Sequence, residues 1–181
     1  MALTFDLIKE RYLSIIGDTH ISNGDLANRI DEAQIIISKY FGKIVSHNYL
    51  ATKDLEYDLP VDHLKTEEVR DSSKNRYREY VINEEGKIIF SEDGQFTLYY
   101  TKVPLPIDPN LKNAAIEVHD VFQHAIIRYC VYRHWEERSE GIPAEEAKAE
   151  RILQRFYRQV EHGTMVLRKR THDPEYLQIG Y

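Results

Sequence analysis

The sequence predicts an α+β fold that is mainly helical, with a four-helix bundle-like body and an antiparallel β-hairpin or meander insertion between helices two and three. Apolar residues recur every three or four positions near both ends of the chain, and they alternate with polar residues over about residues 47–104. A length of 181 residues, 42% of them hydrophobic, suits a single domain over residues 1–172 followed by an extended tail over residues 173–181.

The first two helices are predicted over residues 5–16 and 25–44. Thr4 is placed to act as the N-cap of the first helix, and Gly17 follows its last apolar residue. The second helix has one continuous apolar seam, formed by Leu26, Ile30, Ala33, Ile37, Tyr40 and Ile44. A DNA-binding helix-turn-helix is disfavoured, because the second helix offers mostly acidic residues where a recognition helix needs basic and amide ones. The pair is expected to form a helical hairpin of the body.

The β insertion is predicted from period-two alternation and from glycine at its turns. Phe96, Leu98 and Tyr100 alternate with polar or partly polar residues, as in a half-buried strand. The turns 83–86 and 91–94 each end in glycine, so consecutive hairpins in one meander are expected. The highly charged run 67–78 is expected to be an exposed loop.

The third and fourth helices are predicted over residues 109–137 and 143–162, as an antiparallel hairpin. Asp108 is placed to cap the third helix and Pro109 to occupy its first position. Pro143, followed by two glutamates, starts the fourth helix. Gly163 either ends this helix or only weakens it.

Composition and motifs favour no enzyme class, so no catalytic, cofactor-binding or metal-binding residues are assigned and no cofactor is expected. Glu117, Asp120 and His124 are spaced to share one helix face, but they complete no known metal-binding motif. Cys130 lies among apolar neighbours that favour a buried, protonated thiol. The sequence has no glycine-rich phosphate loop and no nucleophile elbow.

Charge and hydropathy restrict the partners. The formal net charge is −6, from 24 basic and 30 acidic residues, so strong attraction to nucleic acid is not expected. From Arg151 onward, however, the sequence has six basic residues and only three acidic ones. No apolar run approaches the roughly 20 residues that a membrane helix needs, and no signal peptide is recognised. We therefore expect no membrane partner.

Apolar and basic residues near the C-terminal end predict partner docking, because arginine and aromatic side chains are typical anchors of protein interfaces. The residues assigned to docking are Met165, Val166, Leu167, Arg168, Lys169, Arg170, Tyr176, Leu177, Ile179 and Tyr181.

Three motifs, in order, resemble the head-to-tail connector (adaptor) proteins of tailed bacteriophages. They are the segment Tyr57-Asp58-Leu59-Pro60 that opens the β insertion, the Tyr99-Tyr100 strand that closes it, and the long segment 109–132 with His119 and Ala125. His63, where an aromatic or bulky residue after Asp is more usual, departs from the pattern. The resemblance covers most of residues 1–172.

The resemblance implies a structural virion protein without enzymatic activity. It would form a ring of about twelve copies in the neck between capsid and tail, after residence in the host cytoplasm during assembly. Its partners would be the portal protein, adjacent copies of itself and the next neck or tail protein, with DNA only as passing cargo. Two alternatives stay open: a tail-completion or terminator ring, and a helical-bundle metal-binding enzyme or module.

Overall fold

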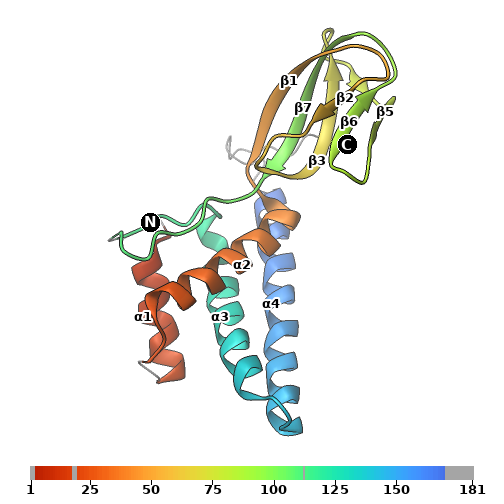
Figure 1. The fold of residues 1–181 in the computed structure, drawn as a ribbon. Helices are drawn as coiled ribbons and strands as arrows, with labels where there is room; N and C mark the ends of the chain where they lie inside the picture. The colour runs from red at the N-terminus through yellow and green to blue at the C-terminus, as the bar shows by residue number, and fades with distance from the viewer. Residues whose placement is uncertain (1–2, 18–19, 112, 170–181) are drawn as a thin grey trace. The chain divides into compact units, whose positions relative to one another are not determined.

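The computed structural model describes residues 3–17, 20–111 and 113–169 (Figure 1). The chain divides into two compact units. Of the described residues, those up to Phe41 and those over 104–169 form the helical unit, and Gly42–Val103 form the β unit. Each unit has its own buried residues.

Four α-helices build the helical unit: α1 (Phe5–Ile16), α2 (Asn23–Phe41), α3 (Gln123–Arg138) and α4 (Pro143–Lys169). A short 3-10 helix, η1 (Asp120–Phe122), leads directly into α3. Because α3 packs against each of the other three helices, it buries residues around most of its circumference rather than along one stripe. Helices α3 and α4 form the predicted antiparallel hairpin (Figure 1).

A buried polar network fixes α1 against α2 and α3. Arg29 Nη2 lies 2.5 Å from Glu137 Oε2, and Arg29 Nη1 donates to Tyr12 Oη at 3.1 Å. The same Tyr12 hydroxyl is hydrogen-bonded to His134 Nδ1 at 3.1 Å. A buried guanidinium needs such partners, because desolvating it without them costs several kcal/mol, on the order of the loss when a buried ion pair is broken.

The helix predicted over residues 109–137 is wrong in nearly its first half, because α3 begins only at Gln123. Residues 114–116 instead run beside the N-terminal segment: Phe5 N donates to Ala114 O at 2.9 Å, and Ile116 N donates to Leu3 O at 3.0 Å. Two polar side chains of α2 also bond to this connection, Asp31 to Ile107 N and Gln34 to Glu117 N. These tertiary hydrogen bonds replace the helical ones that the local sequence favours.

The fourth helix is longer than predicted, since α4 continues through Gly163 to Lys169. Gly163 therefore does not end the helix. The second helix is shorter, since α2 ends at Phe41 and Ile44 begins a strand.

The β unit holds two antiparallel sheets rather than the predicted single meander. The first has the order β1-β7-β3-β4, and the second has the order β2-β6-β5. The strands are β1 (Ile44–Ala51), β2 (Glu56–Asp58), β3 (His63–Asp71), β4 (Arg76–Tyr77), β5 (Tyr80–Ile82), β6 (Lys87–Phe90) and β7 (Gly94–Lys102). The β5–β6 hairpin forms at residues 83–86 as expected, but β7 leaves β6 and pairs with β1 and β3.

The charged run 67–78 is not a loop but contributes to the hairpin of β3 and β4. Three of its charged residues have partners within the sheet: Arg70 Nε lies 2.5 Å from Glu68 Oε1, and Glu67 Oε1 accepts from Thr101 Oγ1 at 2.8 Å. Val69 is buried between these residues, as the pleat of a strand requires.

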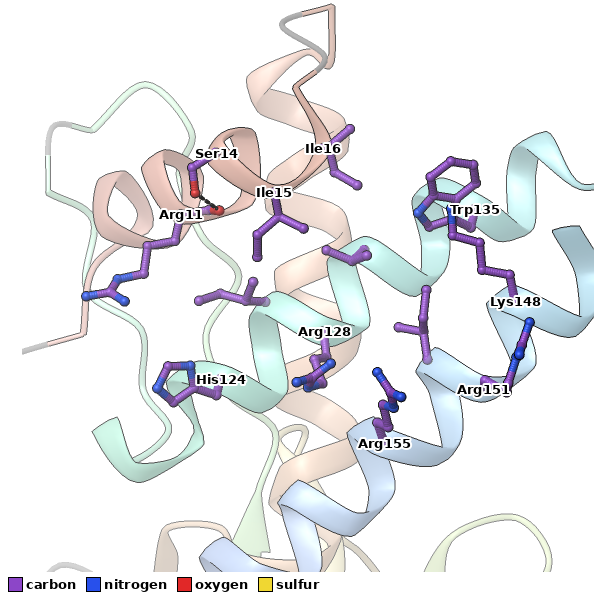
Figure 2. A pocket seen from close by; sticks show the side chains of 13 residues that line it. Arg11, Ser14, Ile15, Ile16, His124, Arg128, Trp135, Lys148, Arg151 and Arg155 are labelled. Carbon is purple, nitrogen blue, oxygen red and sulfur yellow. Dashed lines mark hydrogen bonds between the residues drawn. The ribbon is translucent and has the colours of Figure 1, made fainter.

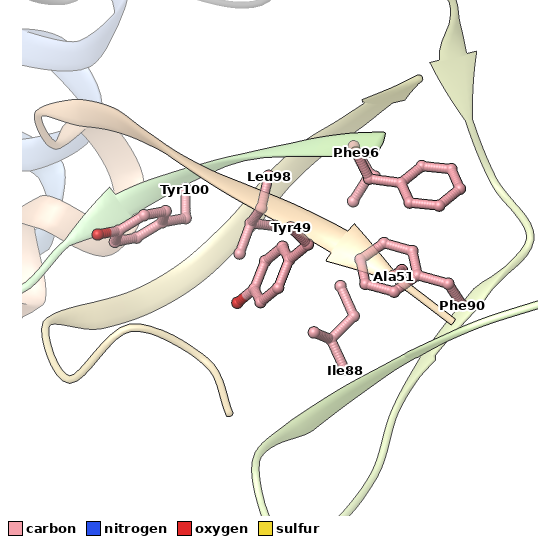
Figure 3. Close-up of a cluster of buried hydrophobic side chains, with 8 residues drawn as sticks. Tyr49, Ala51, Ile88, Phe90, Phe96, Leu98 and Tyr100 are labelled. Atoms are coloured by element: carbon pink, nitrogen blue, oxygen red, sulfur yellow. The ribbon is translucent and has the colours of Figure 1, made fainter. Parts of the chain in front are cut away.

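A cluster of apolar residues lies between the two sheets (Figure 3). Phe90 of one sheet stacks on Phe96 of the other, with ring centroids 4.5 Å apart. The cluster consists of Tyr49, Ala51, Val69, Ile88, Phe90, Phe96, Leu98 and Tyr100.

These observations correct the predicted fold class. The protein is α+β with 47% helix and 25% strand, so it is not a mainly helical bundle with a small insertion. The cause is the β unit, which has two sheets and a core of its own. Over the described ranges, no helix is both long and apolar enough to cross a membrane.

Candidate protein-docking site

A groove of about 680 Å³ opens on the helical unit between α1, α3 and α4 (Figure 2). We call it the α1/α3/α4 groove. It is lined by Arg11, Ser14, Ile15, Ile16, His124, Ile127, Arg128, Val131, Trp135, Lys148, Arg151, Ile152 and Arg155. Thus α1 lines the groove together with α3 and α4, from which it is distant in sequence.

The helical repeat explains why these residues meet. On α4, Lys148, Arg151 and Arg155 follow one another at steps of three and four, so they lie on the same side of the helix. On α3, Arg128, Val131 and Trp135 have the same spacing. Along α3, Trp135 therefore lies toward one end of the groove and His124 toward the other (Figure 2).

The floor of the groove is apolar. Ile127 and Val131 of α3 are buried there, and Ile152 of α4 is half-buried. Ile15 of α1 is 59% exposed, although it lies on the side of α1 that faces α3 and α4. Accessible aliphatic surface of this kind gains free energy when a partner covers it, by about 25 cal/mol per Å².

The rim of the groove is basic. Five of its residues carry a positive charge at neutral pH, and none of the lining residues is acidic; the five are Arg11, Arg128, Lys148, Arg151 and Arg155. Lys148 Nζ lies 3.1 Å from the centroid of the Trp135 ring, in a cation–π contact. Arg151 Nε donates to the backbone oxygen of Ala147 at 3.0 Å.

These cations have no carboxylate partner over residues 3–17, 20–111 and 113–169. The ion pairs of the helical unit lie elsewhere, on Arg29 and Arg133 among others. The groove therefore combines uncovered apolar surface with uncompensated positive charge, and both favour binding of an acidic, partly apolar protein surface.

The residues considered for metal binding do not share a helix face, because Glu117 and Asp120 precede α3. Glu117 Oε2 accepts from Leu105 N at 2.7 Å, and His119 Nδ1 accepts from Val121 N at 3.2 Å as the cap of η1. His124 alone lines the groove. Within the described part of the chain, no three His, Cys, Asp or Glu side chains are grouped so as to hold a metal ion.

Cys130 is fully buried in α3, and burial raises the pKa of its thiol to about 12. A nucleophilic cysteine needs a lowered pKa and access to solvent. In its surroundings Cys130 is a packing residue.

The residues predicted to dock partners fall into two groups. Met165, Val166, Leu167 and Arg168 lie on the last turns of α4, where Met165 is 54% exposed and Leu167 only 5%. Lys169 is the last residue of α4. The others, Arg170, Tyr176, Leu177, Ile179 and Tyr181, lie outside the described residues. The docking role of both groups stays a prediction.

Sequence reasoning missed the α1/α3/α4 groove. The sequence does show the spacing of Arg151 and Arg155 and the excess of positive charge from Arg151 onward. No local pattern indicates that Arg11 and Arg128 border the same apolar floor, because they are more than one hundred residues apart in the sequence.

Comparison of the chain with models of known protein families and with curated proteins finds no match.

Proposed function

We propose that this protein is a structural virion protein that forms a ring at the head-to-tail interface of a tailed bacteriophage. It docks on the portal, bridges it to the next neck or tail component and leaves a channel for DNA. The observation that supports this proposal best is the α1/α3/α4 groove, which suits binding of another protein and contains no arrangement of reactive groups.

Exposed aliphatic side chains on both units also support a role in assembly. In the β unit, Val61 is 107% exposed and Leu50 77%. In the helical unit, Leu105 and Leu111 are each at least 60% exposed. Single exposed apolar residues are common, but a subunit that contacts several partners needs several such surfaces.

The overall charge suits a protein that surrounds DNA without holding it. A net charge of −6 repels the phosphate backbone, so DNA passes through the channel instead of binding to its wall. In this proposal the basic groove binds protein partners and not DNA. The terminal docking residues, from Met165 to Tyr181, contact the portal or a neighbouring subunit in this proposal.

The test is to locate the protein in the particle and to remove it. Cryo-microscopy of intact particles is expected to show a ring of this fold between the portal and the tail. Particles assembled without the protein are expected to be DNA-containing heads that lack tails. Tailed, infectious particles made in its absence would contradict the proposal, and so would its location anywhere outside the neck.

A further inference from the structure

Basic residues are concentrated in the α1/α3/α4 groove, whereas the rest of the molecule has more acidic than basic residues. Five of the 24 basic residues line the α1/α3/α4 groove, which leaves 19 basic against 30 acidic residues elsewhere. A second copy of the chain therefore offers mainly acidic surface to this groove. Charge complementarity of this kind orients two copies before they touch.

The β unit carries a surface with the matching chemistry. The segment 79–86, which includes β5 and the β5–β6 turn, has three glutamates, Glu79, Glu84 and Glu85, and no basic residue. All three glutamates are exposed. Between them, Val81 is 62% exposed and Ile82 36%. Carboxylates that flank accessible aliphatic groups are what a basic rim around an apolar floor can bind.

The geometry of β5 also leaves this segment accessible. Val81 pairs with Ile89, and both point to the sheet face opposite Ile88 and Phe90 of the buried cluster. Within the described strands β5 is an edge strand, since it pairs only with β6. Edge strands with exposed aliphatic residues readily contact another chain.

We propose that the α1/α3/α4 groove of one copy receives the segment 79–86 of a second copy. Val81 contacts the apolar floor, and Glu84 and Glu85 face the arginines of the rim. The contact is heterologous, because it joins two different surfaces of the same chain. Each copy has one groove and one such segment, so contacts of this kind continue from copy to copy; that they close into a ring rests on the proposed function.

Two other occupants fit the groove less well. Nucleic acid would pair with the arginines but leave the aliphatic floor uncovered. The α3–α4 turn and the first turn of α4 are also acidic, with Glu140, Glu145 and Glu146. Their large exposed aliphatic residue, Ile142, is less accessible at 46% than Val81 at 62%. The α3–α4 turn serves as a matched control.

Disulfide trapping between single-cysteine additions tests the contact directly. In the full-length protein we place one cysteine in the groove by Ile15→Cys and one on β5 by Val81→Cys, in separate variants. The native Cys130 is buried and stays unreactive. Under mild oxidation of the mixed variants at high protein concentration, we expect a covalent heterodimer, whereas each variant alone gives little dimer. The control mixture of Ile15→Cys with Ile142→Cys is expected to give little heterodimer.

Several outcomes would overturn the inference. These are equal trapping with Ile142→Cys, efficient homodimers of either variant alone, or no trapping at any concentration. None of them bears on whether the protein resides in the phage neck, which particle imaging decides separately. Conversely, trapping of Ile15→Cys with Val81→Cys supports the contact even if the protein is absent from the neck.

Charge reversal provides a second, independent measurement. The groove variant Arg128→Glu/Arg155→Glu and the β-unit variant Glu84→Lys/Glu85→Lys are each expected to weaken self-association by at least about tenfold. Combining all four substitutions in one chain is expected to restore part of it, because the new glutamates of the groove then face the new lysines of the segment. Circular dichroism confirms that each variant is folded. Failure of the combined variant to regain association, with both partial variants folded, would contradict the assigned pairing.

Discussion

The absence of a side chain at Gly163 lets α4 pack closely against Phe122 of η1. A Cβ at this position would lie 2.6 Å from Cε1 and 2.9 Å from Cδ1 of Phe122, whose side chain is fully buried. The ring of Phe122 thus occupies the space that any larger residue would need. Glycine is kept inside α4 for this contact, although it lowers helix propensity by about 1 kcal/mol relative to alanine.

Gly163→Ala is therefore expected to destabilise the protein by about 1–3 kcal/mol, because displacing a buried ring outweighs the gain in helix propensity. The measurement is the urea midpoint of unfolding. Gly24→Ala in α2 is the matched control, since its new Cβ meets nothing closer than 3.8 Å. It is expected to raise stability by up to about 1 kcal/mol. Equal effects at the two positions would mean that the Phe122 contact is unimportant.

The burial of a single residue, Cys130, determines its reactivity. Burial raises the pKa of its thiol from 9.0 to about 12, so almost no thiolate exists in the folded protein at pH 8. We expect Ellman's reagent to modify Cys130 only as fast as the protein unfolds. The added thiol of Ile15→Cys is expected to react rapidly under the same conditions. Because the folded pKa is raised, the protonated thiol stabilises the fold below pH 9, and this contribution is lost as the pH rises toward 12.

At the scale of elements, the β unit depends on contact between two short sheets. The three-stranded sheet has strands of only three or four residues, which are not stable alone in water. Its inner face is covered by the four-stranded sheet through Phe90 and Phe96 (Figure 3). Phe90 also contacts Tyr49 and Tyr77 of the four-stranded sheet, so it is a central link between the sheets.

Phe90→Ala is expected to lower the stability of the β unit by about 3–5 kcal/mol, the range for deleting a buried phenylalanine. Hydrogen exchange followed by mass spectrometry should then show faster exchange in β2, β5 and β6 than in the wild type. Leu50→Ala is the control, because Leu50 is 77% exposed and is expected to change little. Unchanged protection of the three strands in Phe90→Ala would show that the stack is dispensable.

Elements stabilised by their own sequence were predictable, and those stabilised from a distance were not. The seam of α2 from Leu26 to Ile37 and the start of α4 at Pro143 are confirmed, whereas Tyr40 is exposed and Ile44 belongs to β1. The stretch before Gln123 was mistaken for helix, because its backbone bonds go to Asp31 and Gln34, about eighty residues away. Strand β3 was mistaken for a loop, because its charges pair within the sheet rather than with water.

The candidate site, too, could be predicted only where it depends on local sequence. Basic residues on α4 were visible locally, and so was the absence of catalytic motifs. The groove itself requires the buried network of Tyr12, Arg29 and His134 that fixes α1 beside α3, and this network has no signature in any one segment. A site made by three helices becomes apparent only when their packing is known.

At the scale of the whole molecule, an acidic chain with one basic groove favours head-to-tail association. Most of the surface of one copy repels that of another, while the groove attracts it. Repulsion suppresses random contacts, and the local attraction selects one orientation. Association driven in this way is expected to depend strongly on ionic strength.

Raising sodium chloride from about 0.05 M to about 0.5 M is therefore expected to lower the fraction of associated protein severalfold, since the Debye length falls from more than 10 Å to less than 8 Å. Sedimentation velocity at fixed protein concentration measures the fraction. The folded variant Arg128→Glu/Arg155→Glu is expected to be weakly associated at both salt concentrations, so its salt response is the control. Association that strengthens with salt would contradict this expectation and would indicate that apolar burial alone holds the copies together. Salt leaves the apolar contribution intact, and it screens the repulsion between like-charged surfaces.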